Sequence, residues 1–220
     1  MTDATKSRRP LKSRDRAWAI GLAGRLARAG ARPNAISLAG ILFAALAAAA
    51  LVAARDVGDG LRALLLLAAA AAIQLRLLCN LLDGMVAVEG GRGSRAGEVF
   101  NDAPDRAADA VIFVAAGYAL PWPGWGPALG WSAALLAVLT AYVRMLGGAL
   151  GRPQDFCGPM AKPHRMAVLT VACLASIPEL LLSAGRGWML ALGLAVIVVG
   201  SALTVGRRLV RLVRALESAA

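Results

Sequence analysis

Oxygen-bearing side chains recur at helical spacing in two neighbouring stretches of this sequence. Asn80 and Asp83 are three residues apart in the first stretch, and Asn101 and Asp105 are four apart in the second. Residues three or four apart share one face of a helix, so two facing helices would aim these side chains at one point. Clustered hard oxygen donors suit Mg²⁺, Mn²⁺ or Ca²⁺. The spacing therefore predicts a divalent-cation site.

The two stretches lie at the ends of long apolar blocks. Of the 220 residues, 59% are hydrophobic and 17% are charged, whereas roughly 25% of residues are charged in soluble domains. Blocks of about 18 or more apolar residues predict membrane-spanning helices. We therefore expect an all-α, polytopic membrane protein, and the blocks exclude an ordinary soluble domain.

Six spans are expected, joined by connections that contain Gly, Pro or charged residues. Residues 16–31 are too short and too basic to span, and they predict an amphipathic helix on the membrane surface. This gives a cytosolic segment 1–34, a transmembrane domain 35–206 and a basic cytosolic stub 207–220. The predicted spans are 35–54, 62–88, 98–119, 128–148, 166–184 and 188–206.

Lys and Arg are unevenly distributed along the chain. With both termini in the cytosol, the N-terminal segment, the loops 89–97 and 149–165 and the C-terminal stub lie on one side and hold most of the Lys and Arg. This bias predicts a multi-pass protein of the inner (cytoplasmic) membrane, with the acidic cluster at the cytosolic boundary. It also explains the net charge of +11, so no nucleic-acid partner is expected. Four tryptophans form an expected interfacial belt on the opposite side: Trp122, Trp125, Trp131 and Trp188.

A purely structural role is the alternative interpretation of the acidic residues. Asp83 and Asp105 would then pair with Arg76 and Arg106 and hold the helices together. Because a carboxylate in the membrane is costly unless it is paired, metal-bound or in a wet cavity, we favour a functional role. Two further acids are interpreted as partners or solvated residues, not as ligands: Asp102 and Asp109.

The two stretches resemble the signature of the CDP-alcohol phosphotransferase family, which is Asp-x2-Asp-Gly-x2-Ala-Arg-x8-Gly-x3-Asp-x3-Asp. Every spacing of that signature is kept here, and five of its eight residue identities are kept. The family has six spans, cytosolic termini and an N-terminal surface helix, so the resemblance covers nearly the whole chain. In this sequence the pattern runs Asn80-x2-Asp83-Gly84-x2-Ala87-Val88-x8-Gly97-x3-Asn101-x3-Asp105.

The resemblance implies a transferase that moves a phosphatidyl-type group from a CDP-activated lipid to an alcohol, with release of CMP, in phospholipid biosynthesis. One or two Mg²⁺ or Mn²⁺ ions would hold the diphosphate. Asp83 is implied as a ligand and Asp105 as a ligand or the general base, with Asn80 and Asn101 at the other ligand positions. A homodimer is a further expectation. The residues that would border the nucleotide are Gly84, Ala87 and Gly97.

Three positions depart from the signature, because Asn80 and Asn101 replace aspartates and Val88 replaces the arginine. An asparagine oxygen can ligate a hard cation but brings no charge. The departures leave open a one-metal enzyme, an enzyme with a shifted site, and an impaired member that binds CDP-lipid or nucleotide without turnover. A small ion-binding transporter or scaffold is a further alternative. Three acids would compensate if the third span were rotated: Glu98, Asp102 and Asp109.

A second, basic cluster surrounds the fourth connection. Lys162 and Arg165 precede the fifth span, and Arg144 lies near the end of the fourth. The resemblance implies that these residues contact the acceptor phosphate or a lipid headgroup, and positive-inside topology is the competing explanation. The single histidine, His164, is interpreted as a hydrogen-bonding loop residue.

Overall fold

The structure is a computed structural model that describes residues 16–89, 97–182 and 187–218, with the backbone alone for residues 88–89, 97–101 and 181. Within these ranges the chain forms seven helices and no strand, which confirms the all-α prediction. The helices are α1 (Ala17–Arg28), α2 (Pro33–Ala53), α3 (Asp59–Glu89), α4 (Gly97–Tyr118), α5 (Trp125–Ala149), α6 (Lys162–Leu181) and α7 (Trp188–Glu217).

Four of these helices, α2, α3, α5 and α7, are long and apolar enough to cross a membrane. The other two expected spans, α4 and α6, have 22 and 20 residues. Charged residues interrupt their apolar character, since α4 holds Asp102, Asp105 and Asp109 and α6 holds Lys162, Arg165 and Glu179. Six spans therefore stay a prediction for α4 and α6, as does the surface position of α1.

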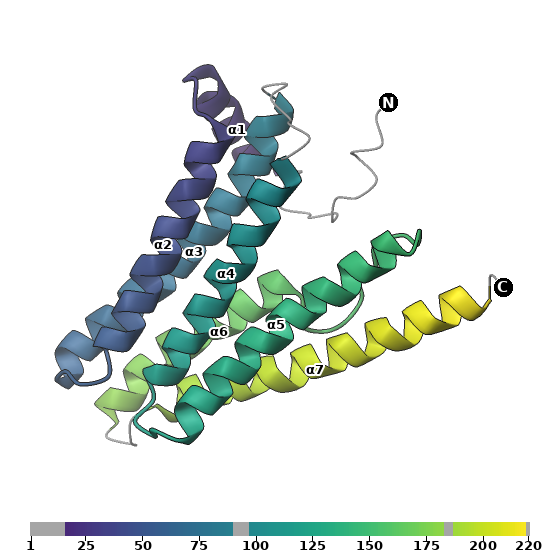
Figure 1. The fold of residues 1–220 in the computed structure, drawn as a ribbon. Coiled ribbons are helices and arrows are strands. Elements are labelled where there is room, and N and C mark those ends of the chain that lie inside the picture. The colour runs from purple at the N-terminus through teal and green to yellow at the C-terminus, as the bar shows by residue number, and fades with distance from the viewer. Residues whose placement is uncertain (1–15, 90–96, 183–186, 219–220) are drawn as a thin grey trace.

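Two groups of helices make up the molecule, as Figure 1 shows. In the first group α2 packs against both α3 and α4, and α1 lies against α3. In the second group α7 packs against α5 and α6. The contacts between α4 and α5 and between α3 and α6 join the groups. Figure 1 shows the groups diverging toward the end at which α1 lies, which is also the end that holds the N-terminus of α4.

Small residues set the distance between α4 and α5. A Cβ atom added to Gly117 would lie 2.6 Å from the Gly126 carbonyl oxygen and 2.8 Å from the Gly130 Cα. Both contacts are with backbone, which cannot move aside as a side chain can. Glycine at these positions therefore lets the two helix backbones touch, a packing mode typical of membrane helices.

The C-terminal basic residues continue α7 and do not form a separate element, because this helix runs to Glu217. Arg208 within it is buried and donates to the Cys157 carbonyl at 2.9 Å and to the Thr140 carbonyl at 2.6 Å. The Met160 amide donates to the Thr204 hydroxyl at 3.0 Å. Helix α7 thus fixes the path of the connection between α5 and α6, which leads directly into Lys162.

Candidate active site

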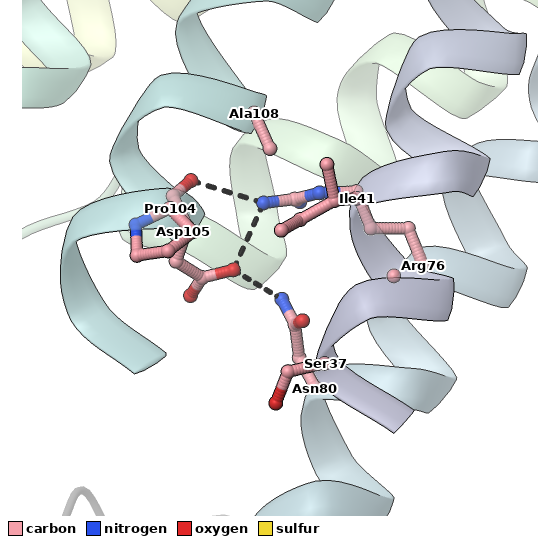
Figure 2. Close-up of a pocket in the computed structure, with 8 residues that line it drawn as sticks. Ser37, Ile41, Arg76, Asn80, Pro104, Asp105 and Ala108 are labelled. Atoms are coloured by element: carbon pink, nitrogen blue, oxygen red, sulfur yellow. Dashed lines mark hydrogen bonds and ion pairs between the residues drawn. The ribbon is translucent and has the colours of Figure 1, made fainter. Parts of the chain in front are cut away.

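Asp105, on the third turn of α4, is the centre of the polar cluster. Its Oδ1 accepts from the Arg76 guanidinium at 3.0 Å and from the Asn80 amide at 2.7 Å, and its Oδ2 accepts from the Lys162 ammonium. Figure 2 shows the Arg76 and Asn80 side chains converging on Asp105. An ionised carboxylate has about four acceptor positions. Three are therefore taken, and the remaining one is on Oδ2.

Arg76 is almost completely enclosed, with 1% of its side chain exposed. Besides the Asp105 carboxylate it donates to the Asp105 backbone carbonyl at 3.0 Å, and it forms an ion pair with Asp109 at 2.7 Å. Asp109 is buried as well, and its other oxygen lies 4.0 Å from Arg165. The interpretation of Asp109 as a partner residue is thereby confirmed. One ion pair that the structural alternative predicts, Arg76 with Asp105, is present.

Asp83, on α3 one turn after Asn80, has a different environment. It is buried, and its carboxylate accepts from the Ser37 hydroxyl at 2.8 Å and from the Gly84 amide at 2.5 Å. Among the residues that the structure describes, no Lys or Arg forms an ion pair with Asp83. The expected structural pairing of Asp83 with arginine is therefore not observed in that part of the chain, and Arg106 pairs with Asp102 instead.

The remaining signature positions lie near the end of α3 and the start of α4. Gly84 and Ala87 lie on the last turns of α3, and both are partly exposed. Gly97 begins α4, and the Asn101 side chain lies outside the described part of the structure. The expected roles of these residues at a nucleotide or a metal stay predictions, as does compensation by Glu98, whose side chain is also outside the described part.

The three basic residues expected at an acceptor occupy three different environments. Lys162 opens α6 and contacts Asp105. Arg144 lies 3.4 Å from Asp102, with its guanidinium 5.4 Å from the centre of the Phe156 ring. Arg165 is buried, where it donates to the Thr140 hydroxyl at 3.1 Å and to the Met160 carbonyl at 2.9 Å.

His164 lies in the first turn of α6 and shares a 2.9 Å hydrogen bond with the Pro159 carbonyl. Because a carbonyl oxygen only accepts, the His164 Nδ1–H is the donor. The interpretation of this histidine as a hydrogen-bonding residue is confirmed, although it lies in a helix and not in the loop.

Asp155 helps to hold the connection before α6 in place. Burial, the largest single influence, raises the pKa of this carboxyl. Hydrogen bonds from the Cys157 amide at 2.8 Å and the Cys157 thiol at 3.2 Å, together with the charges of Arg211, 3.3 Å away on α7, and Arg208, outweigh burial and lower the pKa. The pKa of Asp155 therefore lies below its usual range, and the connection is tied to α7 by charge as well as by hydrogen bonds.

A small crevice opens between α2, α3 and α4 beside Asp105. Its volume is about 10 Å³, which is space for about one water molecule. Figure 2 shows the side chains that line it. They are Ser37, Ile41, Arg76, Asn80, Pro104, Asp105 and Ala108, together with Gly40.

The contacts decide how well these residues suit a metal. No group of three or more His, Cys, Asp or Glu side chains forms a metal site among the described residues. Asp105 is already neutralised by Arg76 and Lys162, whereas Asp83 forms no ion pair with a Lys or Arg of the described part. Since Mg²⁺ commonly keeps several waters and uses one or two carboxylates plus substrate phosphates, Asp83 suits one divalent ion, and a second ion at Asp105 has no free carboxylate.

Two features of the site were not predicted from the sequence. Ser37 is not among the predicted site residues, yet its hydroxyl donates to Asp83 across 46 residues. Lys162 was assigned to an acceptor, but it contacts Asp105 across 57 residues. A polar residue one turn inside an apolar block is a usable signal for Ser37. No local signal exists for Lys162, because the connection after α5 sets its position.

Comparison with solved structures identifies the fold. The chain is similar to Mycobacterium tuberculosis phosphatidylinositol phosphate synthase (PgsA1) in complex with manganese and citrate, with a TM-score of 0.71, 20% identity and 88% of each chain covered. The same enzyme with CDP-DAG bound gives a TM-score of 0.70 and 20% identity over 88% of this chain and 92% of that one.

The apo form of PgsA1 gives a TM-score of 0.65 and 21% identity over 86% of this chain and 93% of that one. No protein-family model and no curated protein matches the sequence. At this identity the likeness shows the fold, and it agrees with the resemblance to a CDP-alcohol phosphotransferase that the signature predicted.

Proposed function

We propose that this chain is a membrane transferase that moves a phosphatidyl-type group from a CDP-activated lipid to an alcohol and releases CMP. One observation carries the proposal: Asp83 and Asp105 keep their signature positions on α3 and α4, in a fold similar to that of an enzyme solved with CDP-DAG bound. The substrates and the reaction of this chain are inferences from that combination.

A divalent ion, Mg²⁺ or Mn²⁺, would be held by Asp83 with oxygen from Asn80 or Asn101, and it would neutralise the diphosphate of the donor. The manganese in one PgsA1 structure supports the choice of ion. Gly84, Ala87 and Gly97 would border the nucleotide. Without large side chains, these positions allow the nucleotide to approach the helix backbone closely.

Asp105 is the proposed general base. The free acceptor position on its Oδ2 would take the proton of the alcohol as the alcohol oxygen bonds to the β-phosphorus and the bond from that phosphorus to the CMP oxygen breaks. Lys162 on the same oxygen positions the carboxylate, and Arg76 and Asn80 fix the other oxygen. The proton thus moves from the hydroxyl to Asp105, and the leaving group departs as CMP.

The acceptor is proposed to reach the site from the side of α5 and α6. Arg144 and Lys162 are the cations there that retain some exposure, 18% of each side chain. Arg165 is 3% exposed and supports the site through Asp109. A phosphorylated or anionic alcohol is favoured by these charges, and the site is proposed to face the cytosol in the inner membrane.

Release of CMP from CDP-diacylglycerol tests the proposal. The full chain, purified in detergent, is supplied with Mg²⁺ or Mn²⁺ and a panel of alcohols that includes glycerol phosphate, inositol phosphate and serine. We expect acceptor-dependent CMP release that chelation abolishes. No release with any acceptor, together with an Asp105→Asn variant that behaves as the wild type, would refute the proposal.

Binding without turnover is the second candidate, and the ion pairs of Asp105 favour it. A carboxylate that receives an arginine and a lysine is a weaker base than a free one, because both cations stabilise its ionised form. Calorimetry with CMP and Mn²⁺ separates the two candidates. Binding of CMP by a chain that releases none from CDP-diacylglycerol would select this alternative.

A further inference from the structure

The two acids that the signature shares with this chain differ in the charge that surrounds them. Asp105 receives a cation on each oxygen, from Arg76 on Oδ1 and from Lys162 on Oδ2. Among the described residues, Asp83 accepts hydrogen bonds from neutral donors, the Ser37 hydroxyl and the Gly84 amide. No Lys or Arg of the described part forms an ion pair with it, although the charge of Lys162 also reaches it. A divalent ion is attracted by a carboxylate with unbalanced charge and repelled by a nearby ammonium or guanidinium.

Arg76 cannot withdraw from Asp105 without breaking several other contacts. Its guanidinium is enclosed and is also held by the Asp105 carbonyl at 3.0 Å and by Asp109 at 2.7 Å. Moving it would leave Asp109 with Arg165, 4.0 Å away, as the remaining ion-pair partner among the described residues. Separating a buried ion pair is strongly unfavourable, so Arg76 is a fixed part of the site.

Lys162 is positioned by the connection before α6. The Met160 amide of that connection is held by Thr204, and the Met160 carbonyl accepts from Arg165. Lys162 follows two residues later as the first residue of α6. Its ammonium therefore reaches Asp105 from a segment that contacts with α5 and α7 hold in place.

Space at Asp105 is also limited. The crevice between Arg76, Asn80 and Asp105 has a volume of about 10 Å³, space for about one water molecule. Mg²⁺ requires six ligands in octahedral geometry, which this volume does not contain. On this side of Asp105, the Arg76 guanidinium already occupies the position next to the carboxylate.

We infer that Arg76 and Lys162 replace one of two divalent ions, so that the site takes a single divalent ion, held by Asp83. One divalent ion with these two side chains carries the same positive charge as two divalent ions. This inference rests on the proposed function, and it assigns Asp105 to the protein's own cations. The inference also explains why residue 80 is Asn. The Asn80 amide donates to Asp105, whereas an aspartate at this position would repel the Asp105 carboxylate.

Counting bound Mn²⁺ tests the inference without measuring turnover. The purified full chain is titrated with Mn²⁺ in the presence of CMP, and unbound Mn²⁺ is quantified by electron paramagnetic resonance. We expect one ion per chain. Asp83→Asn should weaken binding of this ion by more than about tenfold, and Asp105→Asn should retain one ion. Two ions per wild-type chain, or loss of the ion in Asp105→Asn as complete as in Asp83→Asn, would overturn the inference.

Removing a cation supplies the opposite test. Lys162→Met should strengthen Mn²⁺ binding by several-fold or add a second ion, because Asp105 regains unbalanced charge. Arg144→Met is the matched control, since it removes a cation that pairs with Asp102 on the same helix. Unchanged Mn²⁺ binding in Lys162→Met, or an equal gain in Arg144→Met, would contradict the assignment. Size-exclusion chromatography and thermal unfolding confirm that each variant is folded.

The same preparations separate this inference from the proposed function. Acceptor-dependent CMP release by a chain that binds two ions would leave the proposed function standing and overturn the inference. One ion lost with Asp83→Asn, in a chain that releases no CMP, would support the inference and refute the proposed function.

Discussion

Two parts of α4 are held against their neighbours by opposite means. The part up to Asp109 carries Asp105 and Asp109, which meet Arg76, Lys162 and Arg165 in buried or half-buried ion pairs. The C-terminal half carries Gly117, which lets the backbone of α5 approach closely. Ion pairs therefore fix the first part of α4, and close backbone packing at glycine fixes its C-terminal half.

The difference indicates where function lies. Glycine contacts are inexpensive in a membrane helix and need no partner. Buried ion pairs add little net stability compared with apolar packing, and each is costly to break. Because this network adds little net stability, we expect that its five residues serve the proposed chemistry. Predictions that separate activity from stability test this distinction.

The largest effect is expected at Asp105. Asp105→Asn removes the proposed base, so CMP release should fall by about 10²- to 10⁴-fold, while the folded chain persists. Asp102→Asn is the matched control, because Asp102 is another acid of α4, with 40% of its side chain exposed. A smaller loss at Asp105 than at Asp102 would place the base elsewhere.

Asp109 should matter for stability. Asp109→Asn leaves Arg76 and Arg165 facing a neutral group, and breaking such a buried pair costs about 3 to 5 kcal/mol. The free energy of unfolding in mixed detergent measures this loss. An exposed ion pair contributes less than about 1 kcal/mol. A loss of unfolding free energy below that value would mean that Asp109 is hydrated and not part of the network.

At the other end of α4, Gly117→Ala should destabilise the chain and spare the chemistry. The added Cβ meets backbone at 2.6 Å, so overpacking of about 1 to 3 kcal/mol is expected. CMP release per folded molecule should be unchanged. Gly60→Ala is the control, since a Cβ there has nothing within 4 Å. Equal unfolding free energies for the two variants would contradict the close approach of α4 and α5.

The smallest effect concerns pH and the connection before α6. Because the pKa of Asp155 is lowered in the folded chain, its ionised form stabilises the fold at neutral pH, and that contribution disappears as pH falls through the lowered pKa. Asp155→Asn should therefore reduce stability at pH 7 by less than about 1 kcal/mol. The difference from the wild type should shrink as pH falls through the lowered pKa of Asp155. A difference that grows as pH falls would reverse the assigned sign.

Apolar blocks predicted the helices, and the signature spacing predicted that side chains of α3 and α4 meet, as Asn80 and Asp105 do. This worked because burial of apolar faces and helical periodicity act locally. Of the two cations that pair with Asp105, the sequence pointed to Arg76 on α3. It did not point to Lys162, because the position of Lys162 depends on the connection before α6, which has no periodic pattern. The structural alternative paired Asp83 with an arginine, whereas in the structure α2 brings Ser37 to it. Helix α7 is also longer than the predicted span 188–206, because its basic residues continue the helix to Glu217.

Metal-dependent CMP formation by the wild type and by Asp83→Asn, compared in one experiment, tests the proposed metal site most directly. Both chains are stripped with chelator and resupplied with Mn²⁺, CDP-diacylglycerol and the acceptor panel. We predict that Mn²⁺ restores CMP release in the wild type and fails to restore it in Asp83→Asn at the same concentration. Equal release by the two chains, or release that persists without any divalent ion, would contradict this prediction.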